Sequence, residues 1–284
     1  MKKITRRLCL AFFMLGLLHA EDPAILLVRC DDIGMCHAVN VAAKDLADTG
    51  IPLNYSVMFV CPWYQEAVEM LGDYDNVCFG VHLTLNSEWK NYRWGPCSDH
   101  ADVSSLSDEN GYFYHTRQAS YAADPDPAQF ETELRAQIKR ALHCGLKIRY
   151  VDTHMSTLSG REDLHQIVKD LAKEYGLIFH RDVPDETLRG IYSTKPEQKR
   201  KELLNQLKTL ESGRRYLLVS HIGMRGAEMD ALQDMNPGGL NEMSRHREAE
   251  WNSLSSAAFR REIERQGIVL STYAAEADEK VKGK

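Results

Sequence analysis

The sequence of 284 residues lacks the signatures of several protein classes. It has no Cys-x-x-Cys spacing, which argues against structural zinc, and no Gly-x-Gly-x-x-Gly turn of the dinucleotide-binding kind. Basic residues are not in excess, since 35 Lys and Arg face 41 Asp and Glu for a net charge of −6. This balance argues against nucleic acid as the main partner. Beyond the N-terminus, no apolar run is long enough to cross a membrane.

The first twenty residues have the features of a secretory signal peptide. Basic residues at positions 2, 3, 6 and 7 precede the apolar stretch 8–18, and Leu18-His19-Ala20 stands before Glu21. A membrane anchor is disfavoured because the apolar run is too short to span a bilayer. We therefore expect residues 1–20 to be a signal peptide and the mature protein to be secreted or periplasmic. Its six cysteines are even in number, which permits disulfides, but the sequence assigns no pairing.

Strand-like and helix-like patterns alternate along residues 21–284. Continuous apolar runs, typical of strands covered on both faces, occur at 24–30, 53–60, 77–83, 148–152, 177–180, 216–220 and 268–272. Helical patterns lie between them, at 38–49, 63–71, 126–145, 160–176, 195–212 and 244–267. This alternation predicts an α/β fold in a single domain, an irregular or incomplete (β/α) barrel of the TIM type. An open doubly wound sheet is the alternative.

One connection is far longer than a usual strand-to-helix loop. Residues 86–126 separate the third predicted strand from its helix and carry seven Trp, Tyr and Phe residues. Such an insertion could be a small subdomain with its own aromatic core, or its rings could line a cleft and stack on sugar faces. A second long loop, residues 223–241, is rich in Gly and Met and could form another wall.

Acidic and histidine side chains stand at the ends of four predicted strands. Asp31 and Asp32 follow the first run, and His82, His154 and His221 lie at the ends of three later ones. In parallel barrels, functional groups come from the C-terminal ends of the strands. A lone histidine near a core is more often structural, but the repeated placement predicts a hydrolytic metal site.

The adjacent aspartates constrain the local backbone. Successive residues on a regular strand point to opposite faces, so Asp31 and Asp32 can share a site only if the strand ends or bulges at about Cys30. Gly34 supplies a flexible backbone for that turn.

The five side chains suggest a division of roles. One carboxylate and two imidazoles, from Asp32, His82 and His154, form a ligand set that suits Zn²⁺ or, with less imidazole preference, Mg²⁺ or Mn²⁺. Asp31 is then free to accept a proton from water that the metal acidifies, and His221 is placed to protonate a leaving amine. Asp152 shares a strand side with His154, which suggests a supporting partner rather than a ligand.

Four motifs resemble those of the YdjC-like carbohydrate deacetylases, in the same order and spacing over residues 25–272. They are Cys30-Asp-Asp-Ile-Gly34, Gly80-Val-His-Leu-Thr-Leu85 continuing into Ser87-Glu-Trp89, Tyr150-Val-Asp-Thr-His154 and Ser220-His-Ile-Gly223. The resemblance implies a (β/α) barrel, a divalent metal and removal of acetyl groups from N-acetylated sugars. It makes Asp31 the general base, Asp32, His82 and His154 the metal ligands, and His221 the acid.

The chain departs from the family pattern at two places. Many members carry further histidines where this chain has Ser156 and Leu158, so their chitooligosaccharide specificity is not carried over. Ile222 replaces a proline beside His221. Besides an exported deacetylase, two alternatives stay open: a metal-dependent hydrolase or isomerase with a non-acetyl substrate, and a saccharide-binding barrel without catalysis. The sequence does not indicate an oligomeric state.

Overall fold

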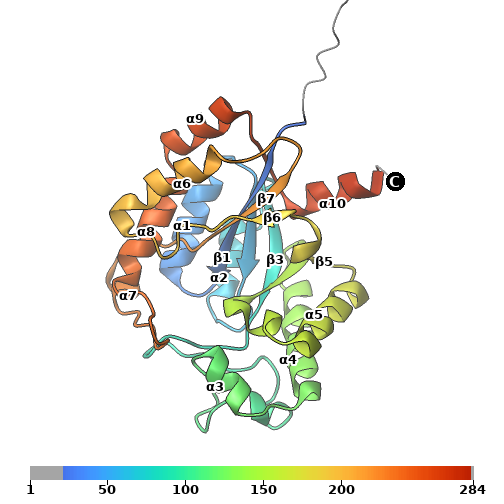
Figure 1. Ribbon diagram of the computed structural model, residues 1–284. Helices are drawn as coiled ribbons and strands as arrows, with labels where there is room; N and C mark the ends of the chain where they lie inside the picture. The colour runs from blue at the N-terminus through green and yellow to red at the C-terminus, as the bar shows by residue number, and fades with distance from the viewer. Residues whose placement is uncertain (1–21, 283–284) are drawn as a thin grey trace, which may run out of the picture.

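Parallel strands carry the fold in the computed structural model, which describes residues 22–282 (Figure 1). The signal peptide predicted at residues 1–20 lies outside the described residues. The strands are β1 (Ile25–Ile33), β2 (Leu53–Val57), β3 (Val77–Leu83), β4 (Ile148–Thr153), β5 (Ile178–Phe179), β6 (Glu186–Thr187), β7 (Arg215–Ser220) and β8 (Val269–Ser271). They pair in the order β5-β4-β3-β2-β1-β7-β6, with β8 also on β1, and every pair is parallel.

The sheet forms a half-barrel rather than a closed one. Its two end strands, β5 and β6, are not paired with each other in the described part of the chain. β8 pairs with β1 at Ile25–Leu27, while β2 pairs with β1 from Arg29 onward, so these two strands use different halves of β1. The single-domain α/β architecture is therefore as expected, and the barrel is incomplete.

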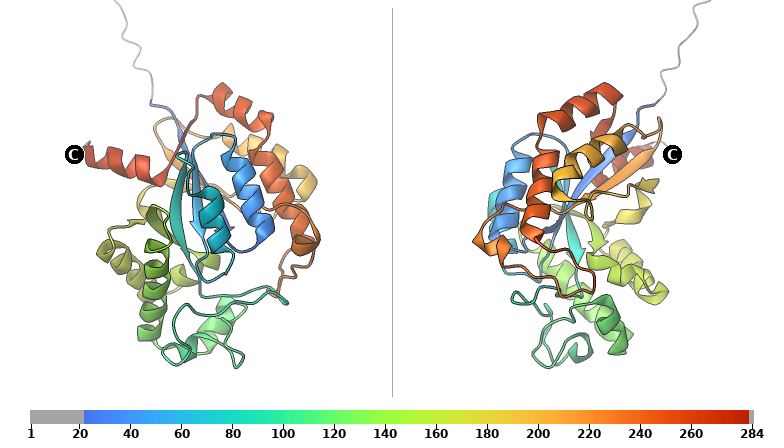
Figure 2. Two further views of the ribbon diagram at one scale, coloured as in Figure 1. Left: turned by 180° about the vertical axis from the view of Figure 1, so that it is seen from behind. Right: turned by 60° about the vertical axis from the view of Figure 1, so that its left-hand side comes forward.

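Most of the helices cover the outer side of the sheet (Figure 2). The longer ones are α1 (His37–Ala47), α2 (Tyr64–Leu71), α4 (Pro127–Leu142), α5 (Glu162–Glu174), α6 (Lys199–Leu207), α8 (Met243–Leu254), α9 (Ala257–Gln266) and α10 (Tyr273–Lys282). Shorter turns are α3 (Arg117–Ala122), α7 (Ala227–Asp230), η1 (Ser104–Leu106), η2 (His154–Ser159), η3 (His180–Asp182) and η4 (Pro196–Gln198). The single helix predicted at 244–267 is two helices, because the Ser256 hydroxyl accepts a hydrogen bond from the Phe259 amide and starts a new helix.

Alternation along the strands separates two apolar layers. On β1, Leu26 and Val28 belong to the large core between sheet and helices, whereas Leu27 belongs to a smaller cluster with Tyr150 and Tyr273 inside the half-barrel. By the same alternation, Arg29 and Asp31 share the inner side with Leu27. The inner side of the sheet therefore becomes polar toward the C-terminal ends of the strands.

Two long connections lie near those ends. Residues 84–126 join β3 to α4 and run beneath the sheet in the view of Figure 1. Three rings of this segment, Trp89, Trp94 and Phe113, are buried in the main core rather than in a separate one. Trp89 also forms an isolated antiparallel bridge with Asp234 of the second long loop. The two loops thus lie side by side.

The remaining sequence expectations concern membranes and disulfides. Among the described residues, no helix combines the length and apolarity that a membrane crossing requires. The six cysteines, Cys30, Cys36, Cys61, Cys78, Cys97 and Cys144, are free thiols.

Candidate active site

A bulge in β1 turns both aspartates toward one site. The register between β1 and β2 shifts between Cys30 and Ile33, and Asp32 has a left-handed backbone with φ 64°. A non-glycine residue in this region is strained and persists where the surroundings hold it. Gly34 follows with φ 82°, and a Cβ there would lie 2.9 Å from the Tyr64 Cα. The bulge expected at about Cys30 is confirmed.

All five residues singled out from the sequence line one cavity of about 290 Å³. Asp31, Asp32, His82, His154 and His221 reach it from β1, β3, η2 and the end of β7. The other lining residues come mostly from the two long loops, from the segment before α6 and from α8: Glu88, Trp89, Met155, Tyr192, Asp234, Asn236 and Arg247.

Three donor atoms in this cavity could hold one metal ion. His82 Nε2 lies 3.4 Å from Asp32 Oδ1, His154 Nδ1 lies 3.3 Å from the same oxygen, and the two nitrogens are 3.2 Å apart. Ligands bound at about 2.0–2.2 Å from one ion are separated by roughly 3–3.5 Å, so the three distances fit. Asp32 Oδ1 is buried and has no hydrogen-bond partner among residues 22–282, which leaves it free for such an ion.

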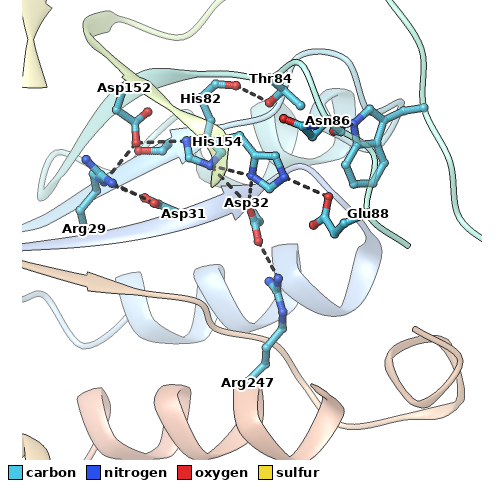
Figure 3. A network of polar contacts seen from close by, with 12 residues as sticks. Arg29, Asp31, Asp32, His82, Thr84, Asn86, Glu88, Asp152, His154 and Arg247 are labelled. Carbon is cyan, nitrogen blue, oxygen red and sulfur yellow. Dashed lines mark hydrogen bonds and ion pairs between the residues drawn. The ribbon is translucent and has the colours of Figure 1, made fainter. Parts of the chain in front are cut away.

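A carboxylate supports each imidazole from its far side (Figure 3). Asp152 Oδ2 lies 3.0 Å from His82 Nδ1, and Glu88 Oε2 lies 3.0 Å from His154 Nε2. Each ring therefore donates one N–H to its carboxylate and turns the other nitrogen toward Asp32. Asp152 is therefore a supporting partner, as the sequence suggested, and the histidine that it supports is His82, its register partner across β3 and β4.

The same charges shift the pKa values of the metal-free site. Burial lowers the pKa of His154, but Glu88 and Asp32 outweigh it and raise that pKa to about 9. Burial also opposes protonation of His82, yet the charges of Asp152 and Asp31 raise its pKa well above the usual value. Protons and a metal ion therefore compete for these imidazoles.

Arg247, on α8, completes the surroundings of Asp32. Its Nη2 donates to Asp32 Oδ2 at 2.6 Å, and its guanidinium lies 5.7 Å from the Trp89 ring centroid. Burial would raise the pKa of Asp32, but the charge of Arg247 and the two neighbouring imidazoles hold it well below the usual range. Asp32 is therefore a carboxylate whose one oxygen is paired and whose other oxygen faces the imidazoles.

Arg29 pairs with Asp31 as Arg247 pairs with Asp32. Its Nε and Nη2 donate to the two oxygens of Asp31 at 2.7 and 2.9 Å, and Nε lies 3.1 Å from Asp152 Oδ2. Asp31, His82 and Asp152 form a second group with the spacing of a cation site. A cation is already supplied there, because the Arg29 guanidinium bridges the two carboxylates, so the Asp32 group is the better candidate for a metal ion.

His221 lies on another wall of the cavity, directly after β7. Its backbone N–H donates to Glu250 Oε2 at 2.7 Å, and its ring packs against Tyr192 with centroids 5.1 Å apart. Ring atom Nδ1 is buried without a hydrogen-bond partner in the described part of the chain. The ring therefore lines the cavity without a hydrogen bond at Nδ1 from the described residues.

Sequence reasoning missed three charged residues of the site, namely Arg29, Glu88 and Arg247. Arg29 had a local signal, since it is the one cation in the first apolar run and stands two residues before Asp31. Glu88 lies within a motif block but was given no role. Of the three residues that depart from the family pattern, Leu158 and Ile222 are buried in the core, and Ser156 lines a separate cavity together with His180.

Comparisons with known proteins identify the family and the fold. The family model described as YdjC-like protein matches residues 25–265. Similar curated proteins include the carbohydrate deacetylases of Thermoanaerobacter pseudethanolicus, 30% identical over 54% of this chain and 58% of the relative, and of Thermus thermophilus, 32% identical over 59% and 56%. The chain thus matches little more than half the length of these relatives.

Solved structures show the same fold. A proposed cellobiose-phosphate cleavage protein from Enterococcus faecalis V583 superposes with a TM-score of 0.74 at 22% identity, covering 89% of this chain and 99% of that one. The Xyl-CE4 domain of a xylanase from the hindgut metagenome of Trinervitermes trinervoides has a TM-score of 0.50 at 9% identity, with 91% of each chain covered. Since the family model spans most of the chain and the half-barrel is shared, the protein belongs to the YdjC-like family.

Proposed function

We propose that this protein is an exported, divalent-metal-dependent carbohydrate deacetylase that hydrolyses the acetamide of an N-acetylated sugar to a free amine and acetate. The observation that carries the proposal is the convergence of three metal-donor atoms, a separate carboxylate and a separate imidazole on one cavity. Amide hydrolysis needs those three functions: an electrophilic activator, a base for water and an acid for the amine.

The names of the curated relatives support the choice of reaction and substrate class. Carbohydrate deacetylases match this chain over residues that make up little more than half of each relative. The proposed metal is Zn²⁺ or, with less imidazole preference, Mg²⁺ or Mn²⁺.

The protein residues divide the work as follows. A divalent ion held by Asp32, His82 and His154 supplies Lewis acidity toward water and the acetyl carbonyl. Asp31, fixed by both donors of Arg29, takes the proton of the attacking water. His221 delivers a proton to the departing nitrogen from its own side of the cavity.

The cavity also limits the substrate. Its volume of about 290 Å³ lies just below the usual range for small-molecule pockets, which is room for one sugar ring at the reacting position. Trp89 and Tyr192 offer aromatic surface for a ring face, and Asp234 and Asn236 offer partners for hydroxyl groups.

The test is acetate release from a panel of N-acetylated monosaccharides and oligomers, with and without a chelator. We expect release that the chelator abolishes and that added divalent metal restores. A protein that binds these sugars without releasing acetate would be a saccharide-binding barrel. Metal-dependent turnover of other compounds alone would indicate a hydrolase or isomerase with a non-acetyl substrate.

Export is tested separately. The charged start, the apolar stretch at residues 8–18 and Ala20 lead us to expect a mature chain that begins near Glu21. Mass spectrometry of protein recovered from the cell envelope or medium identifies the N-terminal residue directly. An intact N-terminus in envelope material would favour an uncleaved anchor instead.

A further inference from the structure

Two charged side chains that the proposed chemistry does not use lie buried behind one wall of the cavity. Lys199 begins α6 and Glu250 lies on α8; both are fully buried, and Lys199 Nζ is 2.8 Å from Glu250 Oε1. Burying both charges is costly, and an apolar pair of similar volume is often at least as stable. Stability alone therefore does not explain the pair.

Lys199 holds the segment that carries Tyr192. Its Nζ donates to the backbone carbonyls of Ile191 and Tyr192, each at 2.6 Å, in addition to Glu250. These three contacts use all three N–H groups of the ammonium. The backbone that places the Tyr192 ring on the cavity wall is therefore fixed to α6.

Glu250 holds the residue that follows β7. Its Oε2 accepts hydrogen bonds from the Ser220 hydroxyl at 2.9 Å and from the His221 backbone N–H at 2.7 Å. The His221 ring has no such anchor, since its Nδ1 is unpaired among residues 22–282. Its place is set by the backbone at Glu250 and by the Tyr192 ring 5.1 Å away.

We propose that the Lys199–Glu250 pair is a positioning device that sets His221 and Tyr192 relative to each other across the substrate cavity. The inference rests on the proposed function, in which His221 is the acid. Neither Lys199 nor Glu250 lines the cavity, so they act only through the two rings. Because a displacement of about 1 Å in a catalytic group can cost roughly 100-fold in rate, such a link matters to turnover.

The test replaces both charges at once, as K199M/E250L, so that no unpaired charge stays buried. A matched control is R215M/E276Q, which removes the ion pair between Arg215 and Glu276, 2.8 Å apart, at the opposite end of β7. We expect kcat to fall roughly 10- to 100-fold in K199M/E250L and to stay near wild type in the control. Metal content should be unchanged in both.

Two further measurements distinguish a loss of ring placement from a general loss of structure. Combining K199M/E250L with His221→Asn should lower kcat no further than His221→Asn alone, because both changes remove the same placed imidazole. In protein labelled at Tyr and His, the nuclear Overhauser contact between the Tyr192 and His221 rings should be lost in K199M/E250L and kept in the control.

Additive losses of kcat, or a ring contact that persists in K199M/E250L, would overturn the positioning role. If K199M/E250L does not fold, Glu250→Gln alone should show the same loss of kcat and of the ring contact. A Glu250→Gln protein that keeps both would equally overturn the proposal. If the wild-type protein releases no acetate from any sugar, the proposed function fails, while the ring contact still decides whether the pair sets the two rings.

Discussion

The charge of Glu88 should govern how metal affinity depends on pH. Glu88→Gln keeps an oxygen that can accept a hydrogen bond from His154 Nε2, 3.0 Å away in the wild type. It removes the charge that contributes most to raising the pKa of His154 to about 9. At that pKa only about one His154 ring in a hundred is neutral at pH 7, which weakens metal binding there by roughly 3 kcal/mol. As pH rises toward 9, this competition disappears and wild-type affinity increases.

Replacing the Glu88 carboxylate has two opposite effects on metal affinity. Without the Glu88 charge, only Asp32 still opposes the effect of burial, so the pKa of His154 falls and proton competition at pH 7 largely vanishes. The imidazole also becomes a weaker ligand, because losing a supporting carboxylate typically lowers metal affinity by roughly 10- to 100-fold. The two effects nearly cancel at pH 7, and the full loss emerges only near pH 9.

The assay is metal affinity by competition with a coloured chelator, from about pH 6 to about pH 8.5. Each competing histidine adds about one unit to the slope of log affinity against pH, and His82 keeps its Asp152 partner in the variant. The slope should therefore drop by about one in Glu88→Gln. Glu109→Gln, an exposed position in the same connecting segment, is the control and should match wild type. Equal slopes in wild type and Glu88→Gln would refute the assignment of Glu88.

Two other substitutions test separate parts of the account. Asp31→Asn keeps the shape of the side chain and removes its basicity, while Arg29 retains Asp152 as a partner. Turnover should therefore fall by roughly 10²–10⁴-fold with metal content unchanged. Loss of the metal would instead mean that Asp31 is a ligand. Gly80→Ala would place a Cβ 2.4 Å from the Tyr150 ring. That ring is fully buried and its hydroxyl is hydrogen-bonded to Ser56, so it has little room to move. Denaturant unfolding should therefore show that the free energy of unfolding falls by about 1–3 kcal/mol. An unchanged unfolding midpoint would mean that the inner layer is looser than these distances indicate.

The sequence was most informative about the strands and their ends. Continuous apolar runs identified seven strands because both faces of a parallel sheet are covered. The eighth strand, β6, escaped because it has two residues, Glu186 and Thr187, both exposed. The break between α8 and α9 escaped because the apolar pattern continues across it, although Ser256 was a visible capping signal.

The sequence predicted the site residues at strand ends but not the residues that support them. Strand ends place Asp31, Asp32, His82, His154 and His221 together because parallel strands end at one edge. The residues that support them come from loops and helices far along the chain. Arg247, for example, reaches Asp32 from 215 residues away, and no local pattern marks such a partner.

The shared metal site is the central claim, and elemental analysis of purified wild-type and His82→Ala protein tests it most directly. His82 Nε2 is one of three donors around a single position, so its loss should leave too few ligands to hold an ion. We expect about one divalent metal per wild-type chain and none in a His82→Ala protein whose circular dichroism shows a native fold. A folded His82→Ala protein that retains stoichiometric metal would contradict the ligand set of Asp32, His82 and His154.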